Sequence, residues 1–319
     1  SHTGAEPQRD RKGDKPAVGR AAAMPRLKAL LDEAREGQGV AVRLRGEAGL
    51  GKSRLARALL DHAQSQGLPG LLVQVLDFGL AAAEAPLRRL AEGLLGRVAE
   101  GEALLAGLAA PRRAALLDLL ERALPEELSA LWALQGVAAR RQALQGALGD
   151  LVQAATARRA LLLVVEDLHW ADATLLGALA ALRAATAERP LLLLLTTRAE
   201  GEPFAPGGAA QAQRAGLVTL DLAPLASEAS LALARHLAAA DPTLDRALLR
   251  AEGNPLYLIQ LLRHAGEGPL PDSLQGLVQA RLDRLELPVR TLLRAAAVLG
   301  QRADPAAVAA LLESRPAGF

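Results

Sequence analysis

The fold is decided by the stretch Gly46-Glu47-Ala48-Gly49-Leu50-Gly51-Lys52-Ser53. It matches the phosphate-binding loop pattern G-x-x-x-x-G-K-[ST] at every fixed position. The glycines let the backbone curl so that successive N–H groups point inward and form an anion-binding nest. Lys52 can reach the β- and γ-phosphates of a nucleotide, and Ser53 can offer its hydroxyl to Mg²⁺. All eight residues are therefore candidate nucleotide-binding residues, Lys52 is also a candidate catalytic residue, and Ser53 is also a candidate Mg²⁺ ligand.

The residues on both sides of this loop have the pattern that the motif requires. Residues 40–44 alternate as in a strand, and Leu55 and Leu59 fall on one face of a helix. A strand, a loop and a helix in this order place a helix N-terminus, with its positive dipole end, at the phosphate site. Arg54, which follows the loop directly, is included among the candidate nucleotide-binding residues.

Composition limits the class of protein. The 319 residues are 51% hydrophobic, which is enough for one large domain or two to three smaller ones. No apolar run reaches the ~18 residues of a membrane helix, and the polar N-terminus does not resemble a secretory signal. Cysteine is absent, which excludes disulfides and thiolate metal sites. We therefore expect a cytoplasmic protein that does not bind membranes.

The composition also gives no reason to expect that this chain binds nucleic acid. The formal net charge is only +2, and aromatic residues make up 2% of the chain. Basic blocks interleaved with aromatic side chains are typical of nucleic-acid surfaces, and this chain has no such block.

Strand patterns recur along the first two thirds of the chain, with helical patterns between them. This alternation predicts parallel βαβ units in an α/β sheet of the P-loop NTPase kind. The strands are expected at about 40–45, 71–75, 160–166, 190–197 and 217–222. Residues 80–158 are rich in Ala and Leu, so we expect several inserted helices there, with a packing role. After Leu222 only helical patterns remain.

Several breaks divide this last, helical part. Ser227 is expected to cap one helix, and Asp241-Pro242 opens the next. Gly253-Asn254-Pro255 interrupts the chain before another helix, and Asp304-Pro305 begins a short final one. Residues 1–17 are polar and have no periodicity, so we expect a disordered linker or tag there.

Residues 161–167 (LLLVVED) are five apolar residues followed by two acids. A buried parallel strand delivers such carboxylates to its carboxyl-terminal edge, where ligands bind in open α/β sheets. One carboxylate can hold Mg²⁺, and a second can orient or deprotonate the attacking water. By position we assign Glu166 to the metal and Asp167 to the water, with both kept as candidate catalytic residues and Mg²⁺ ligands.

Residues 191–198 (LLLLLTTR) form a similar strand with a polar end. If this strand lies between the two nucleotide-binding strands, Thr197 or Arg198 would sense the γ-phosphate. Arg suits that role because its planar guanidinium donates two hydrogen bonds to phosphate oxygens. An arginine that merely ends a core strand at the surface is the equally plausible alternative. For His169, Trp170 and Asp172 we favour structural roles, with Asp172 capping the following helix.

Four segments together resemble a known family. They are GEAGLGKSRL, VVEDLHWADATLL, LLLTTR and AEGNPLYLIQLL, in this order. They look like the STAND class of signal-transduction ATPases, and especially like the ATPase segments of bacterial class III adenylate cyclase fusions and of large LuxR-type regulators. The resemblance runs from Val18-Gly19-Arg20 to about Gly300. It departs from many relatives at Glu166, where they have Asp.

The resemblance implies further roles. Val18, Gly19 and Arg20 would contact the adenine, and Pro255 would pack near the base or ribose. Residues 18–222 would form the nucleotide domain, residues 223–286 a helical lid, and residues 287–319 an incomplete winged-helix segment. The expected cofactors are ATP or ADP and Mg²⁺, and the expected partners are copies of the chain or fused effector domains in the ATP-bound state.

The sequence therefore predicts a slowly hydrolysing, ATP-dependent regulatory switch. A DNA-associated ATPase of the origin-binding kind, with the winged helix contacting DNA, is one alternative. A scaffold that binds nucleotide without hydrolysis is another.

Overall fold

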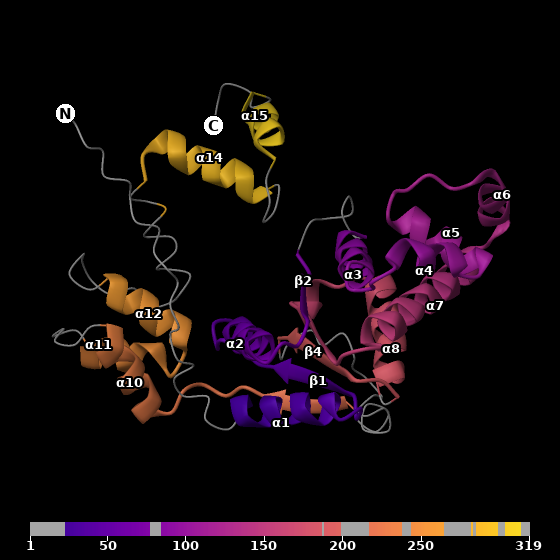
Figure 1. The fold of residues 1–319 in the computed structure, drawn as a ribbon. Helices are drawn as coiled ribbons and strands as arrows, with labels where there is room; N and C mark the ends of the chain where they lie inside the picture. Colours follow the sequence, from indigo (N-terminus) through magenta and orange to yellow (C-terminus); the bar gives the residue numbers. More distant parts are fainter. Residues whose placement is uncertain are drawn as a thin grey trace, which may run out of the picture.

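A five-stranded parallel sheet forms the centre of the molecule (Figure 1). The structure is a computed structural model, and it describes residues 23–76, 84–186, 188–198, 217–237, 244–264, 282, 285–298 and 304–313. The strands are β1 (Val40–Arg45), β2 (Gly70–Gln74), β3 (Leu161–Glu166), β4 (Leu191–Thr197) and β5 (Leu217–Asp221). Their order across the sheet is β2-β3-β4-β1-β5. The expected strands and their parallel arrangement are thus confirmed.

The strand that comes fourth along the chain lies in the middle of the sheet. In the register of β4, Leu192 is opposite Val40 of β1, and Leu191 is opposite Leu161 of β3. All seven residues of β4 are buried, as are the six residues of β3. Continuous apolar strands of this kind are typical of parallel sheets covered on both faces. β4 therefore lies between the strand before the phosphate loop and the strand that carries the acids. This is the strand order on which the prediction that Thr197 or Arg198 senses the γ-phosphate depends.

Two hydrophobic cores cover the two faces of the sheet. On one face lie α1 (Ala23–Arg35) and α2 (Lys52–Ser65), which pack Leu27 and Leu59 against Val42 and Leu194. On the other face, α3 (Ala85–Leu95), α7 (Val137–Thr156) and α8 (Ala173–Thr186) pack against alternate residues of the same strands, such as Leu193. The alternation of side chains along each strand makes this division possible.

The segment between β2 and β3 is helical in its described part, as expected. It comprises α3, α4 (Gly101–Gly107), α5 (Ala110–Leu119), α6 (Glu126–Leu134) and α7. These helices extend from the sheet toward the right of Figure 1, and they share the core that α8 also joins. Their packing role is therefore supported by the burial of Leu90, Leu116 and Leu148.

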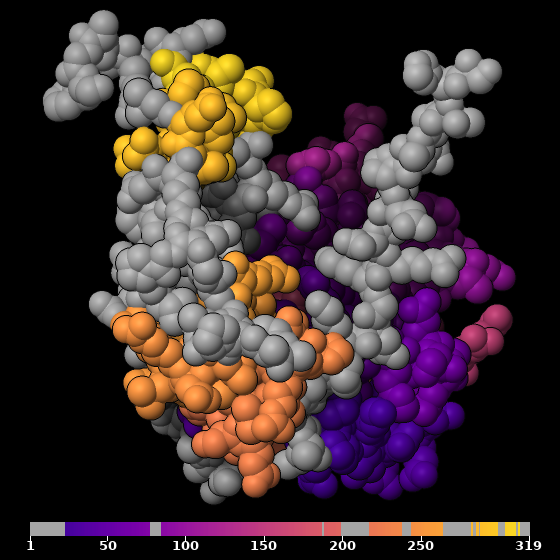
Figure 2. Space-filling view, turned by 90° about the vertical axis from the view of Figure 1, so that its left-hand side faces the viewer, coloured from indigo at the N-terminus to yellow at the C-terminus, as the bar shows by residue number. Residues whose placement is uncertain are grey.

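The helices after β5 form a separate cluster. α10 (Ser227–Leu237), α11 (Leu244–Ala251) and α12 (Pro255–His264) surround a core of their own that includes Leu233, Tyr257 and Leu258. We call this cluster the lid. Its surface lies beside that of α1 and α2 in the space-filling view (Figure 2). The expected break at Gly253-Asn254-Pro255 is confirmed, whereas Asp241-Pro242 lies outside the described residues.

Two more helices follow, α14 (Leu287–Val298) and α15 (Pro305–Glu313), and they pack against each other. The Asp304 side chain accepts a hydrogen bond from the Ala306 N–H at 3.1 Å, which marks the expected start of the last helix. The winged-helix assignment and the domain boundaries stay predictions. Among the described helices, none combines the length and the apolar content that crossing a membrane requires.

Candidate nucleotide-binding site

The phosphate loop connects β1 to α2 at the carboxyl edge of the sheet. Gly49 and Gly51 have φ angles of 83° and 92°, in the left-handed region that favours glycine. Gly51 directly precedes α2, and its carbonyl accepts the first helical hydrogen bond, from Leu55 N–H at 2.9 Å. The Gly46 N–H donates to the Thr197 carbonyl at 3.3 Å, which ties the loop to β4. The loop therefore ends at the N-terminus of a helix, where an anion is favoured.

Lys52 is the first residue of α2, and its buried ammonium group reaches back to the start of the loop. Its side chain is 8% exposed, and its Nζ donates to the carbonyls of Gly46 at 2.7 Å and Glu47 at 2.8 Å. Burial lowers its pKa, and the nearby acids Asp167 and Glu166 offset this in part. A buried ammonium that bonds neutral carbonyls is well placed to compensate the charge of a phosphate.

Glu166 ends β3 and is fully buried. Burial raises the pKa of its carboxyl group, and the Ser53 hydroxyl, which faces it, offsets this rise in part. Among the described residues, no hydrogen bond of normal geometry reaches either carboxylate oxygen. Buried polar atoms are nearly always satisfied in native proteins, so an unsatisfied carboxylate indicates a missing partner.

A divalent cation fits this donor set. Carboxylate and hydroxyl oxygens are the ligands that Mg²⁺ prefers, and the Glu166 carboxylate and the Ser53 hydroxyl face each other. When bound with a nucleotide, Mg²⁺ would neutralise phosphate charge.

Asp167 follows Glu166 in a left-handed conformation, with φ 63° and ψ 45°. Such backbone strain in a residue other than glycine is common at functional sites. The strain is held by a hydrogen bond from the Asp167 N–H to Thr196 Oγ1 at 3.0 Å and by another from the Trp170 N–H to the Asp167 carbonyl at 3.0 Å. Thr196, which the sequence did not single out, thus positions the second acid.

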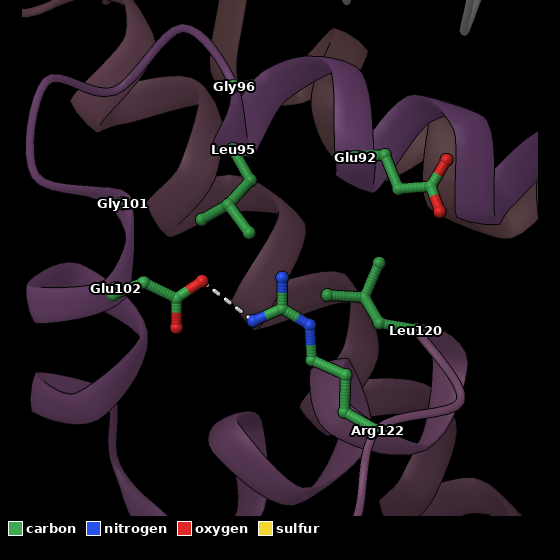
Figure 3. A pocket seen from close by; sticks show the side chains of 7 residues that line it. All are labelled: Glu92, Leu95, Gly96, Gly101, Glu102, Leu120 and Arg122. Atoms are coloured by element: carbon green, nitrogen blue, oxygen red, sulfur yellow. Dashed lines mark hydrogen bonds and ion pairs between the residues drawn. The ribbon is translucent and has the colours of Figure 1, made fainter.

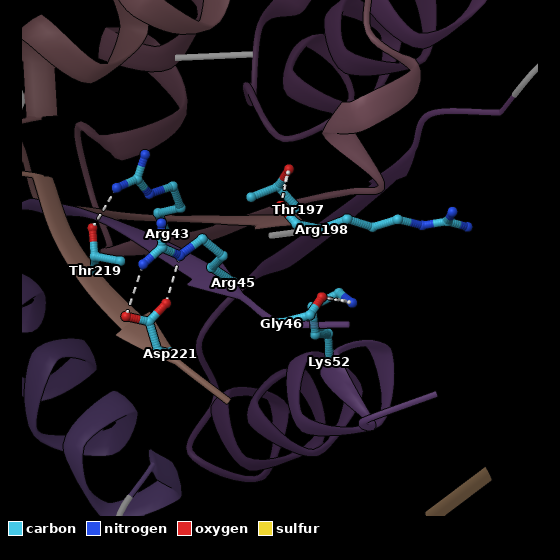
Figure 4. A network of polar contacts seen from close by, with 8 residues as sticks. All are labelled: Arg43, Arg45, Gly46, Lys52, Thr197, Arg198, Thr219 and Asp221. Carbon is cyan, nitrogen blue, oxygen red and sulfur yellow. Dashed lines mark hydrogen bonds and ion pairs between the residues drawn. The ribbon is translucent and has the colours of Figure 1, made fainter. Parts of the chain in front are cut away.

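The residues after Thr196 lie at the same edge. The Thr197 side chain is buried, and its hydroxyl donates to the Arg198 carbonyl at 3.3 Å. The Arg198 guanidinium lies 6.0 Å from the centre of the Trp170 ring, within the range of a cation–π contact. Figure 4 shows its extended side chain pointing away from the polar contacts between β1 and β5. Arg198 is also close enough to Lys52 to lower the pKa of the lysine.

The polar contacts in Figure 4 fix the edge strand β5 to β1. Arg45 donates to the two carboxylate oxygens of Asp221 at 2.6 and 3.1 Å, and Arg43 donates to Thr219 Oγ1 at 2.9 Å. The hydrogen bond to Arg45 lowers the pKa of Asp221. This pairing holds the strand that leads into the phosphate loop.

His169, Trp170 and Asp172 differ in their surroundings. The Asp172 carboxylate accepts a hydrogen bond from the Leu175 N–H at 2.8 Å, which confirms it as the cap of α8. In the described part of the chain, both ring nitrogens of His169 are buried without a hydrogen-bond partner. Its pKa is lowered by burial first and then by Arg198, so the structure places this histidine beside the candidate site.

The lid also contacts the phosphate loop directly. The Asn254 amide nitrogen donates to the Ala48 carbonyl at 3.0 Å, and the Leu256 N–H approaches the Gly49 carbonyl at 3.3 Å. Pro255 is the first residue of α12, directly beside these contacts. Sequence reasoning missed Asn254, although an Asn before Pro at a helix start is a capping signal. Of the other predicted residues, Arg54 lies in the first turn of α2, and Val18, Gly19 and Arg20 lie outside the described residues.

The inserted helices carry a pocket of about 350 Å³ (Figure 3). It lies between the ends of α3, α4 and α5, and the ion pair between Arg122 and Glu102 at 2.8 Å crosses it. None of its lining residues belongs to the candidate nucleotide site, so it is a separate feature of the insertion.

Residues 16–195 match the family model of the AAA ATPase domain. Because this match covers more than half of the 319 residues, the chain belongs to the AAA ATPase domain family. An uncharacterized protein of Rhizobium meliloti (strain 1021) is 28% identical over 325 residues, which cover 93% of this chain. The chain spans only 31% of the length of that relative.

Many solved structures share the fold, among them the following two. One is a Signal Transduction ATPase with Numerous Domains (STAND) protein with a tetratricopeptide repeat sensor, from Pyrococcus horikoshii. It is 16% identical, with a TM-score of 0.53, and the match covers 98% of this chain and 40% of the other. The other is the ORC1 protein of Aeropyrum pernix in complex with DNA, 17% identical with a TM-score of 0.50, covering 94% of this chain and 78% of the other. At these identities the likeness is one of fold.

Proposed function

We propose that this chain is a regulatory switch that binds ATP with Mg²⁺ and hydrolyses it slowly. The observation that carries the proposal is the meeting of a complete phosphate loop with a buried, unsatisfied carboxylate. Lys52 of the loop and the acids Glu166 and Asp167 lie within electrostatic reach of one another. A bound phosphate would compensate the positive charge of the lysine, and its metal ion would compensate the negative charge of the acids.

Each candidate residue takes a role that follows from its position. The N–H groups of the loop and Lys52 bind the phosphates, while Ser53 and the acids Glu166 and Asp167 hold Mg²⁺. Arg198, at the end of the central strand, contacts the γ-phosphate once it turns from Trp170 toward the loop. Preference for adenine over guanine rests on the family resemblance at Val18, Gly19 and Arg20, and Pro255 completes that pocket.

Hydrolysis is an in-line attack of water on the γ-phosphorus. The new bond joins the water oxygen to phosphorus, the bond to the bridging oxygen breaks, and ADP and inorganic phosphate are the products. Asp167 orients the water and accepts its proton. Because Asp167 is held by Thr196 of the central strand, its position depends on the sheet rather than on a mobile loop.

The switch role rests on the resemblance to STAND ATPases and on the fold shared with the Pyrococcus horikoshii protein. Such a switch needs different affinities for ADP and ATP in its two conformations. The ADP-bound form would be closed, and the ATP-bound form would assemble with other copies or release fused effector domains. The output would reside in further parts of a longer protein, and the Rhizobium meliloti relative is longer than this chain, which spans 31% of it.

The first test identifies the nucleotide that the purified protein carries. After denaturation, ion-exchange chromatography should find ADP in nearly stoichiometric amount, because a closed switch retains its product. Lys52→Ala should bind no nucleotide, whereas Asp167→Asn should bind ATP and lose turnover. A Lys52→Ala protein with normal ATP affinity would refute the site, and an empty wild-type protein would favour the scaffold or the DNA-associated ATPase.

The DNA-associated ATPase remains a second candidate because the fold is shared with the ORC1 protein solved with DNA. That function predicts affinity for duplex DNA that falls steeply with salt concentration. The formal net charge of +2 argues against it. A fluorescence anisotropy titration with a duplex, at two salt concentrations, decides between the two.

A further inference from the structure

Two successive carbonyl groups of the phosphate loop point toward the lid. The Ala48 carbonyl accepts a hydrogen bond from the Asn254 amide, and the Gly49 carbonyl accepts one from the Leu256 N–H. Asn254 and Ala48 are 206 residues apart in the sequence. The first contact is made by a side chain, so its chemistry can be changed by substitution.

These contacts determine the direction of two N–H groups. In a planar trans peptide, the carbonyl and the following N–H point in opposite directions. The N–H groups of Gly49 and Leu50 therefore point away from the lid. In a phosphate loop such N–H groups line the anion-binding nest, so the lid orients two of the donors that phosphates require.

Several contacts hold the half-buried Asn254 in place. A Cβ added to Gly49 would lie 2.6 Å from Asn254 Oδ1, which shows how closely the loop and the lid approach each other. Asn254 Oδ1 also accepts hydrogen bonds from the N–H groups of Leu256 at 3.1 Å and Tyr257 at 3.2 Å, which caps α12. On the other side, the Leu225 N–H donates to the Gly253 carbonyl at 2.8 Å. The Asn254 amide thus joins the start of α12 to the loop.

We propose that Asn254 is a positioning residue of the nucleotide site, because its amide holds the Ala48–Gly49 peptide in the orientation that nucleoside diphosphates and triphosphates need. Phosphate binding then depends on the docked lid. This inference rests on the proposed function, since it concerns the same site. By thermodynamic linkage, the nucleotide in turn stabilises the docked lid.

The decisive variant is Asn254→Ser. Serine caps a helix as well as asparagine does, but it lacks the amide donor that reaches Ala48. We expect affinity for a fluorescent ADP analogue to fall roughly five- to tenfold, which is what the loss of one hydrogen bond brings. The urea midpoint without nucleotide should fall less than in Asn254→Ala, because serine keeps the cap of α12. Asn254→Ala should lose both the affinity and the cap, with a lower midpoint.

Two controls separate positioning from general stability. Asp304→Ala removes a cap of another helix, α15, and should leave ADP affinity unchanged. Saturating ADP should slow hydrogen exchange of the amides at 256 and 257 in the wild type, and less so in Asn254→Ser.

Suppose that Lys52→Ala has lost ADP binding, as the proposed function requires. If Asn254→Ser then binds ADP as tightly as the wild type, or if ADP slows hydrogen exchange equally in both proteins, the inference about Asn254 is wrong and the proposed function still stands. If the wild type binds no ADP, or Lys52→Ala binds it normally, the proposed function fails as well.

Discussion

At the scale of the residue, Glu166 is an ionisable group that the folded chain buries completely. Its pKa is raised by burial above the usual carboxyl value near 4.5. At a pH between the pKa of Glu166 in the unfolded chain and its raised pKa in the folded protein, the folded protein binds more protons than the unfolded chain does. The stability of the nucleotide-free protein therefore falls as the pH rises through this window.

Glu166→Gln should make the nucleotide-free protein more stable at pH 8, by about 1–3 kcal/mol, because it removes a buried charge that lacks a well-formed hydrogen bond. The gain should shrink as the pH is lowered toward 4.5. Urea unfolding at several pH values measures both effects. The same variant should weaken Mg²⁺-dependent ATP binding, and equal stability of the two proteins at pH 8 would contradict the buried, unsatisfied state of this carboxylate.

Thr196 gives a second prediction at this scale. Thr196→Val keeps the shape of the side chain but removes the acceptor of the Asp167 N–H. Turnover should fall about tenfold or more, while ADP affinity should change less than twofold, because the strained Asp167 loses its support. Phosphate release and ADP titration measure the two quantities. Thr196→Ser, which keeps the hydroxyl, serves as the control and should retain turnover.

At the scale of the element, α8 depends on its cap. Asp172→Ala removes the acceptor of the Leu175 N–H and should lower the free energy of unfolding by about 1 kcal/mol. Asp172→Asn should retain most of the stability, since asparagine caps equally well. Chemical denaturation of both variants at the same pH tests this, and equal losses would mean that the negative charge, rather than the cap, matters.

The positions of the strands were the part of this structure that the sequence predicted best. The strands 161–166 and 191–197 were predicted to within one residue because a buried parallel strand needs a continuous apolar run. The phosphate loop was predictable because the residues that define its motif, Gly46 and Gly51-Lys52-Ser53, lie within one short segment. Thr196 and Asn254 were not, because their partners lie 29 and 206 residues away in the sequence. A local pattern carries no information about such pairings.

At the scale of the whole molecule, nucleotide binding should stabilise the fold. ADP at a hundred times its dissociation constant should raise the free energy of unfolding by about 2.7 kcal/mol if it binds only the folded state. Lys52→Ala should show no such rise. Thermal unfolding with and without ADP measures this difference, and a rise in both proteins would indicate a nucleotide site elsewhere.

The central place of β4 also affects how the protein is made. β1 is the first of the five strands to leave the ribosome, and both of its neighbours, β4 and β5, are synthesised about 150 residues or more later. At roughly 5–20 residues per second, β1 waits on the order of ten seconds or longer for its first partner. Pairings between such distant segments also form slowly. During biosynthesis the nascent chain therefore exposes the apolar residues Val40, Val42 and Leu44 of an unpaired strand. It can bind a nucleotide only after most of the sheet has been synthesised.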